Sequence, residues 1–115
     1  MTAELPRISV VVPVHDEAGA VETLVTEIAE AFSGRAYEMV LVNDASRDQT
    51  LTILQDLKAR FPALRVLSHG ANAGQSRAVR TGILAARGEV VVTLDGDGQN
   101  PPSEAPKLVD ALLAA

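Results

Sequence analysis

The sequence predicts an α/β fold: a Rossmann-like parallel sheet with helices on both of its faces. Three observations lead to this prediction. Four short apolar runs rich in Val, Ile and Leu show little alternation, which is typical of strands covered on both faces. The segments between these runs carry apolar residues at helical spacing. Only a few residues connect each element to the next, and a βαβαβαβα order of this kind requires parallel strands joined by right-handed crossovers.

Each element is predicted from its own residues. The apolar runs place strands at residues 8–14, 37–43, 64–68 and 89–95. A first helix is predicted because apolar residues repeat with the period of a helix at Val21, Leu24, Val25, Ile28 and Phe32.

The other three helices are predicted from their starts. The second is expected to begin at the stretch SRDQ, where Ser46 and Gln49 have the spacing of a capping box. The third is expected at about residues 74–86, and the fourth near Ser103, just after two prolines.

Length and composition exclude several classes of protein. A chain of 115 residues fits one domain with a modest core, 1–115. The net charge of −5 and the 3% of aromatic residues disfavour a surface for nucleic acid. Because there is no cysteine, disulfides and thiol chemistry are excluded. No apolar run approaches the ~20 residues that cross a bilayer, and no signal peptide is recognisable, so we expect a cytoplasmic location.

The two outer strands of a four-stranded parallel sheet have open edges. Such edges are usually covered or paired. We therefore expect either a longer protein, of which this chain is a part, or a homo-oligomer that forms through the exposed sheet edges.

Polar residues gather where each predicted strand ends. In open α/β sheets ligands bind beyond the carboxyl ends of the strands. The four polar stretches are PVHDE (13–17), NDAS (43–46), SHGANAGQS (68–76) and DGDGQNPP (95–102). Carboxylates, amides and glycines from four strand ends on one edge predict a binding site.

The stretch after the fourth strand has the residue types of a divalent metal site. Asp95 and Asp97 are hard oxygen ligands of the kind that Mg²⁺ and Mn²⁺ prefer, and Gln99 can add a carbonyl oxygen. Glycines at 96 and 98 allow the backbone to turn sharply, so that carboxylates at i and i+2 can converge. A solvated turn is the alternative, since Asp and Gly are turn residues.

The other polar residues each have a structural alternative. Asp16 and Glu17 could simply stabilise the N-terminus of the first helix. Asp44 could be a turn residue. Arg77 and Arg80 could be solvated charges, although they follow an Asn-Ala-Gly stretch where helix amides favour an anion.

Beyond these physical patterns, the chain resembles the family 2 glycosyltransferases in four segments, taken in order. VVVPVHDE is similar to their VVxPxYNE opening, and VLVNDASRDQT to their VxVDDGSxDxT. NAGQSRAVRTGI resembles N-x-G-x-x-x-A-x-x-x-G, and LDGDGQNPPSEAPKLV resembles LDADLQ-x-P-P-E-x-x-P-x-L. The last form, with Gln and two prolines, is most like the polyprenyl-phosphate sugar transferases, such as dolichol-phosphate mannosyltransferase and the undecaprenyl-phosphate enzymes.

The resemblance implies that the chain is the N-terminal half of a GT-A fold, the part that binds a nucleotide-diphospho-sugar. Catalytic and acceptor-binding groups would lie beyond this chain, and the full-length protein would act at the inner face of the membrane on polyprenyl phosphate. The residues implied are Pro13, His15, Glu17 and Asp44 at the base and ribose, Ser76 and Arg80 near the sugar-phosphate end, and Asp95, Asp97 and Gln99 around the Mg²⁺ or Mn²⁺ that bridges the diphosphate.

Three positions depart from the family pattern. Asn43 replaces the first acid of an Asp pair, His15 replaces an aromatic residue, and Gly98 replaces a larger apolar residue. These changes affect the contacts to the base and the rigidity of the loop, and leave the predicted metal ligands intact.

Three functions are compatible with these patterns. The first is the donor-binding half of a metal-dependent glycosyltransferase that uses a UDP- or GDP-sugar. The second is a non-catalytic nucleotide-sugar-binding or oligomerising fragment. The third is a nucleotidyltransferase or phosphotransferase, although the glycine-rich basic loop expected after its first strand is absent.

Overall fold

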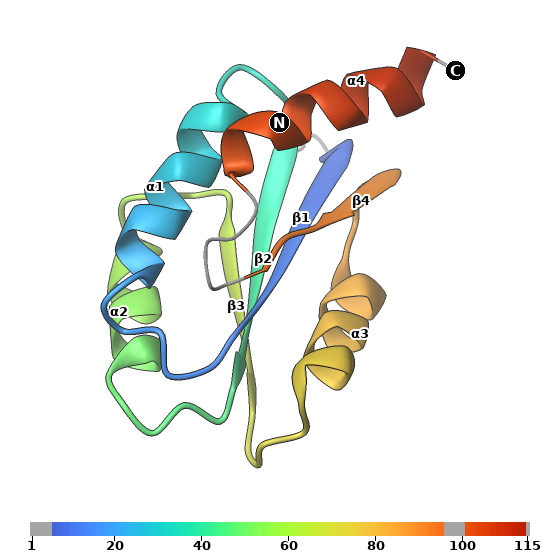
Figure 1. Cartoon of the computed structure of the whole chain (residues 1–115). Helices are drawn as coiled ribbons and strands as arrows, with labels where there is room; N and C mark the ends of the chain where they lie inside the picture. Colours follow the sequence, from blue (N-terminus) through green and yellow to red (C-terminus); the bar gives the residue numbers. More distant parts are fainter. Residues whose placement is uncertain (1–5, 96–100, 115) are drawn as a thin grey trace, which may run out of the picture.

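The structure of the chain is a computed structural model, and it describes residues 6–95 and 101–114. Within these residues four parallel strands form one sheet in the order β3-β2-β1-β4 (Figure 1). The strands are β1 (Ile8–Val14), β2 (Tyr37–Asp44), β3 (Leu64–His69) and β4 (Val90–Thr93). The helices are α1 (Val21–Ala31), α2 (Thr50–Leu57), α3 (Gln75–Ala85) and α4 (Ala105–Ala114), the last preceded by a 3₁₀ turn, Pro102–Glu104. The predicted α/β class is therefore confirmed.

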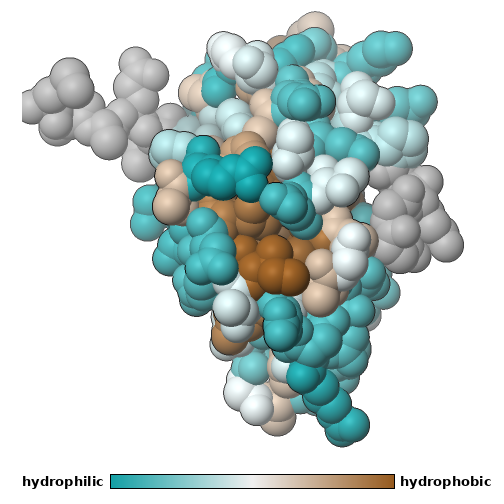
Figure 2. Space-filling model, turned by 90° about the vertical axis from the view of Figure 1, so that its left-hand side faces the viewer, coloured by the Kyte–Doolittle hydropathy of each residue, from teal (hydrophilic) through white to brown (hydrophobic). Residues whose placement is uncertain are grey.

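Helices cover both faces of the sheet, as Figure 1 shows. In β1 alternate residues point to opposite faces. Val10 and Val12 belong to the larger core, which α1, α2 and α4 cover, whereas Val11 packs with Val40, Val42 and Ala78 beneath α3. On the side formed by α1 and α2, apolar side chains in the middle are ringed by hydrophilic ones (Figure 2). All seven residues of β1 are buried, which explains why its sequence shows no alternation.

The strand order creates a crevice at one point of the sheet. The chain moves outward from β1 to β2 and β3, and then returns through α3 to place β4 on the other side of β1. The connections that leave β1 and β4 therefore diverge between the two strands. Such a reversal of strand order is where α/β sheets bind ligands.

The predicted start of α2 is wrong. The helix begins at Thr50, and the expected capping box does not form. The hydroxyl of Ser46 instead donates to Asn43 Oδ1, and Asp48 Oδ1 accepts the Thr50 N–H at 2.9 Å. Ser46 and Gln49 have the spacing of a capping box, but the Ser46 hydroxyl bonds instead to Asn43 and to the N–H of Asp16 in the loop after β1.

The strand limits differ by a few residues from those predicted. The strand β4 is shorter, ending at Thr93, whereas β2 and β3 each run one residue further, to Asp44 and His69. The two strands gain these residues because Asp44 and His69 are paired in the sheet register.

Within the described residues β3 and β4 are the outer strands of the sheet. Apolar side chains are exposed on α3, β4 and α4, at Ile83, Leu84, Val91, Leu108, Leu112 and Leu113. No helix among residues 6–95 and 101–114 is long and apolar enough to cross a bilayer.

A glycine allows α3 to lie close to the sheet. A Cβ added at Gly82 would lie 2.4 Å from Val11 Cγ1 and 3.2 Å from Val42 Cγ2. Both neighbours are fully buried β-branched side chains, which cannot move aside easily.

Replacing Gly82 with alanine is therefore expected to lower the free energy of unfolding by about 1 to 3 kcal/mol. The better helix propensity of alanine, about 1 kcal/mol, offsets only part of this overpacking. Urea denaturation followed by circular dichroism measures the change. The matched control is Gly19→Ala, where the added Cβ meets nothing within 4 Å. Equal stability of the two variants would show that α3 does not pack this closely.

Candidate functional site

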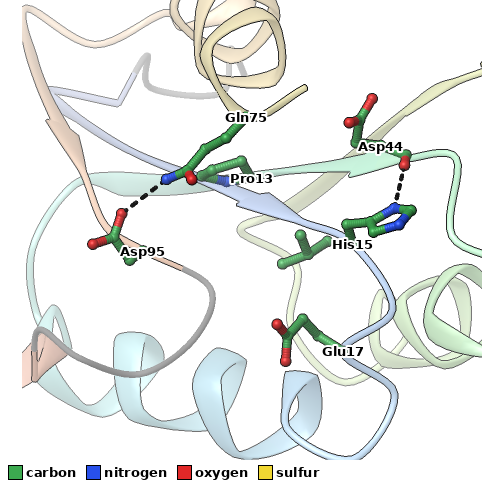
Figure 3. A pocket seen from close by; sticks show the side chains of 7 residues that line it. Pro13, His15, Glu17, Asp44, Gln75 and Asp95 are labelled. Atoms are coloured by element: carbon green, nitrogen blue, oxygen red, sulfur yellow. Dashed lines mark hydrogen bonds between the residues drawn. The ribbon is translucent and has the colours of Figure 1, made fainter. Parts of the chain in front are cut away.

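A pocket of about 220 Å³ lies at the carboxyl ends of the strands, at the reversal of strand order between β1 and β4 (Figure 3). Its lining comes from the ends of β1, β2 and β4, the loop before α1, and the first turn of α3. The lining residues are Pro13, Val14, His15, Glu17, Asp44, Gln75 and Asp95.

The pocket brings together most of the residues that the sequence singled out. Five of them line it: Pro13, His15, Glu17, Asp44 and Asp95. Ser76 and Arg80 are exposed on α3 and do not line it. Asp97 and Gln99 lie outside the described residues.

Gln75 is a pocket residue that sequence reasoning missed. Its Nε2 donates to Asp95 Oδ1 at 3.1 Å, so the amide connects the start of α3 to the end of β4 (Figure 3). Its position in the sequence could have indicated this role, because Gln75 directly follows a glycine at the start of a predicted helix. In the structure that glycine, Gly74, has a φ of 93°, which suits glycine. A side chain at that point faces the same sheet edge as the strand ends.

The carboxylate of Asp44 anchors the loop between β3 and α3. Its side chain is only 6% exposed. Oδ1 accepts hydrogen bonds from His69 Nδ1 at 2.8 Å and from the Ala73 N–H at 2.9 Å, and Oδ2 accepts the Gly74 N–H at 2.9 Å. Asp44 is therefore more than a turn residue, because both carboxylate oxygens hold another segment of the chain.

These contacts change the ionisation of Asp44. Burial alone would raise its pKa, but the hydrogen bonds from Ala73, His69 and Gly74 together hold the pKa below its ordinary value. On the far side of the imidazole, His69 Nε2 lies 2.8 Å from Thr81 Oγ1. His69 thus links the end of β2 to α3, a role that the sequence did not reveal.

His15 separates the pocket from a second hollow of about 240 Å³. That hollow is lined by His15, Asp16, Ala45, Arg47 and Asn72. His15 Nδ1 donates to the Asp44 backbone carbonyl at 2.6 Å, which sets the orientation of the ring (Figure 3). The imidazole is 40% exposed and therefore accessible to a ligand from either side.

The charge of the main pocket restricts what it can bind. Glu17, Asp44 and Asp95 contribute carboxylates, and the described residues that line it include no lysine or arginine. Carboxylates can accept hydrogen bonds from hydroxyl and N–H groups of a ligand. An anionic group such as a diphosphate would be repelled unless a cation lay between it and these acids.

The donor set around Asp95 suits a hard cation. Carboxylate and amide oxygens, such as those of Asp95 and Gln75, are ligands that Mg²⁺ and Mn²⁺ prefer. Among the described residues no group of three His, Asp or Glu side chains is close enough to hold a metal by itself.

Comparisons with known proteins agree with this architecture. Residues 9–115 match the family model described as glycosyl transferase family 2. The chain is 42% identical over 106 residues to undecaprenyl-phosphate 4-deoxy-4-formamido-L-arabinose transferase of Pseudomonas paraeruginosa, covering 90% of this chain and 31% of that protein. It is 37% identical over 106 residues to dolichol-phosphate mannosyltransferase of Pyrococcus furiosus, covering 92% and 30%.

Solved structures show the same fold. The mannosyltransferase PcManGT from Pyrobaculum calidifontis, in complex with GDP-Man and Mn²⁺, superposes with a TM-score of 0.82 at 28% identity, covering 97% of this chain and 33% of that one. TarS from S. aureus, in complex with UDP-GlcNAc, gives a TM-score of 0.77 at 25% identity, covering 94% and 31%.

The chain spans about a third of the length of these relatives. The family match nevertheless covers almost all of its residues, and the parallel sheet, the reversal of strand order and the acidic pocket all fall within the matched part. The chain therefore belongs to glycosyl transferase family 2.

Proposed function

We propose that this chain is the donor-binding part of a metal-dependent glycosyltransferase that takes a sugar from a UDP- or GDP-sugar. The observation that carries the proposal is the acidic pocket at the reversal of strand order, because its carboxylates need a cation before a nucleoside diphosphate can bind. Similar chains from P. calidifontis and S. aureus are in complex with nucleotide sugars, the former with Mn²⁺.

The residues on the β1 and β2 side would contact the nucleoside. His15, 40% exposed, presents a flat ring, and Glu17 presents a carboxylate that can accept hydrogen bonds from ribose hydroxyls. Pro13 would shape the floor of the pocket. Asp44 would act mainly by fixing the surrounding loops, since both of its carboxylate oxygens already accept hydrogen bonds.

The residues on the β4 side would contact the diphosphate. Asp95, Asp97 and Gln99 would hold Mg²⁺ or Mn²⁺, with Gln75 orienting the Asp95 carboxylate at 3.1 Å. When bound, the metal would neutralise charge on the departing nucleoside diphosphate as a Lewis acid. Ser76 and Arg80, exposed on the first turns of α3, would lie toward the sugar-phosphate end.

The acceptor proposed is a polyprenyl phosphate. Its support is the names of the relatives, which act on undecaprenyl phosphate or dolichol phosphate. Because the chain spans about a third of these proteins, we place the acceptor site and the catalytic groups outside residues 1–115. The whole protein would then work at the inner face of the membrane.

Calorimetric titration of UDP and GDP tests the donor site. We expect the chain to bind at least one nucleotide, with affinity at least about tenfold higher in Mn²⁺ than without a divalent metal, because the metal bridges like charges. Asp95→Asn and Asp97→Ala should each remove most of this metal dependence.

The matched control is Asp56→Ala, which removes an exposed carboxylate from α2, away from the pocket. It should bind as the wild type does. If neither nucleotide bound, or if binding ignored both the metal and the two substitutions, the assignment of the site would be wrong. Binding with no transfer by the full-length protein would instead favour a non-catalytic nucleotide-sugar-binding role.

A further inference from the structure

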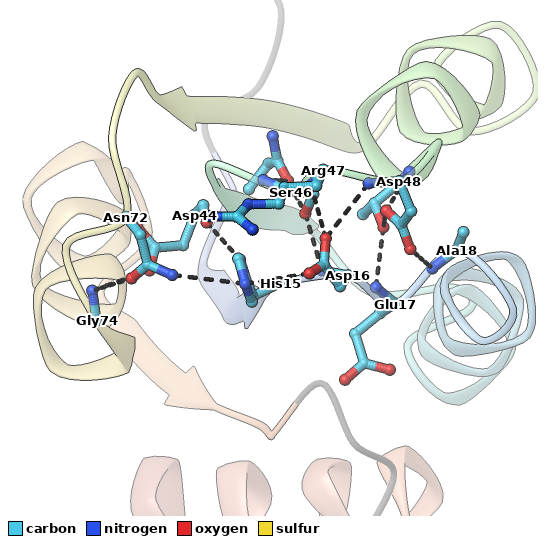
Figure 4. Close-up of polar contacts among 12 residues, drawn as sticks. His15, Asp16, Glu17, Ala18, Asp44, Ser46, Arg47, Asp48, Asn72 and Gly74 are labelled. Carbon is cyan, nitrogen blue, oxygen red and sulfur yellow. Dashed lines mark hydrogen bonds and ion pairs between the residues drawn. The ribbon is translucent and has the colours of Figure 1, made fainter.

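The loops that follow β1 and β2 exchange hydrogen bonds in both directions (Figure 4). Three consecutive backbone N–H groups of the first loop donate to side chains of the second loop and of the first residue of α2: Asp16 N to Ser46 Oγ at 3.0 Å, Glu17 N to Thr50 Oγ1 at 2.9 Å, and Ala18 N to Asp48 Oδ2 at 3.1 Å. In return, Asp16 Oδ1 accepts the N–H groups of Arg47 at 2.6 Å and Asp48 at 3.3 Å. We call the four side chains Asp16, Ser46, Asp48 and Thr50 the loop clamp.

Both loops contain a residue in a rarely occupied backbone conformation. Asp16 has φ of 51° and Ala45 has φ of 52°, in the left-handed region that side chains usually avoid. Aspartate tolerates this region, whereas alanine has no side-chain hydrogen bond to compensate. Backbone strain of this kind persists only where surrounding contacts fix it, and it gathers at functional sites.

The loop clamp joins the surface to the buried start of α2, where Thr50 is fully buried. The side chain of Asp16 is 41% exposed, and Asp48 is exposed as well. Its contacts lie at the carboxyl edge of the sheet, beyond the buried parts of β1 and β2. The effect of the loop clamp on binding is therefore expected at the two residues that flank Asp16.

Those two residues are pocket residues. His15 precedes Asp16 and Glu17 follows it, and both line the main pocket. The two oxygens of Asp16 divide the contacts: Oδ1 holds the second loop, and Oδ2 lies 3.3 Å from His15 Nε2 (Figure 4). His15 Nδ1 donates to the Asp44 carbonyl, and Nε2 lies beside both the Asp16 carboxylate, at 3.3 Å, and Asn72 Nδ2, at 3.5 Å.

We propose that Asp16 is a positioning residue for nucleotide binding: through the loop clamp it holds His15 and Glu17 in the orientation that receives the nucleoside. This inference rests on the proposed function. Asp16 lines the second hollow and not the main pocket, so we assign its effect on binding in the main pocket to its two neighbours. Pre-organisation of this kind increases affinity, because the loop need not be ordered on binding.

Two substitutions at Asp16 separate positioning from folding. Asp16→Gly suits the φ of 51° and removes the acceptor, whereas Asp16→Asn keeps an acceptor oxygen and also tolerates this conformation. In the nucleotide-free chain, Asp16→Gly should speed amide hydrogen exchange at Arg47 and Asp48 about tenfold or more, and Asp16→Asn should leave it nearly unchanged. Unchanged exchange in Asp16→Gly would overturn the loop clamp itself.

The same variants are then titrated with whichever of UDP and GDP the wild type binds in Mn²⁺. We expect Asp16→Gly to bind about tenfold more weakly and Asp16→Asn to bind within about twofold of the wild type. In a His15→Ala background the effect of Asp16→Gly should shrink, because the two residues act on the same contact.

The outcomes distinguish this inference from the proposed function. A wild-type chain that binds neither nucleotide would overturn the proposed function and, with it, the role of Asp16. A wild type that binds, with Asp16→Gly binding equally well, would overturn the positioning role alone. Additive effects of Asp16→Gly and His15→Ala would show that Asp16 does not act through His15.

Discussion

Replacing Asp44 with alanine is expected to lower the free energy of unfolding by about 3 to 5 kcal/mol. The substitution removes a buried carboxylate on which three donors converge, those of His69, Ala73 and Gly74. Each donor would lose a charged acceptor whose side chain is only 6% exposed. Urea denaturation followed by circular dichroism measures the loss, and nucleotide affinity should fall as well, because the loop before α3 is released.

The isosteric variant Asp44→Asn provides the control for this prediction. One amide oxygen can still accept from His69 and Ala73, but the amide nitrogen would face the Gly74 N–H, and two donors cannot bond to each other. We expect a loss intermediate between the wild type and Asp44→Ala. If Asp44→Ala were as stable as the wild type, Asp44 would be a solvated turn residue after all.

Replacing Glu38 with alanine is expected to destabilise the fold by a similar amount, about 3 to 5 kcal/mol. Glu38 lies at the opposite end of β2, is 4% exposed, and accepts hydrogen bonds from Ser9 Oγ at 2.6 Å, the Arg87 N–H at 2.7 Å and Arg65 Nη1 at 2.8 Å. Its removal would take the charged acceptor from all three donors, of which Arg65 Nη1 would keep the Ala85 carbonyl at 2.9 Å. Nucleotide affinity of the folded fraction should not change, because the site lies at the other edge of the sheet.

The pH dependence of stability provides a further test of these two acids. For Glu38, burial would raise the pKa, but the donors from Ser9, Arg87 and Arg65 together hold it below its ordinary value, as the donors around Asp44 do for that residue. Below about pH 4 these two carboxylates therefore become protonated in the unfolded chain while they remain ionised in the folded chain. The stabilisation is complete above that pH and is lost as the pH falls through the lower pKa values of the folded state.

Matched variants make this prediction specific. Denaturation midpoints between pH 7 and pH 3 should fall less steeply for Glu38→Gln and for Asp44→Asn than for the wild type, since neither amide can be protonated in this range. Equal slopes for all three proteins would mean that other acids cause the acid sensitivity.

Much of the architecture could be predicted from the sequence because its signals are local. The uninterrupted apolar residues of β1 indicate a strand buried on both faces, and the spacing from Val21 to Ile28 indicates a helix with one apolar face. Four polar pocket residues, His15, Glu17, Asp44 and Asp95, lie in the stretches that follow predicted strands, and such stretches must share one edge of a parallel sheet, whereas Pro13 was implied by the family resemblance.

Other features depended on partners far away in the chain. Thr50 is a helix residue by sequence, yet its hydroxyl oxygen accepts a hydrogen bond from the N–H of Glu17, 33 residues earlier. Asp44 is of a residue type common in turns, yet its two carboxylate oxygens accept hydrogen bonds from a loop about 30 residues later. Nothing in the spacing of nearby residues indicates such contacts.

The sequence by itself thus determined the order of strands and helices, the family, and the edge of the sheet at which the chemistry gathers. The tertiary structure decided that β4 lies on the opposite side of β1 from β2, which opens the pocket between Glu17 and Asp95, and it decided which donor satisfies each carboxylate. The physical reason is that periodicity and propensity act over a few residues, whereas hydrogen bonds at a sheet edge are shared among loops that meet only once the sheet has formed.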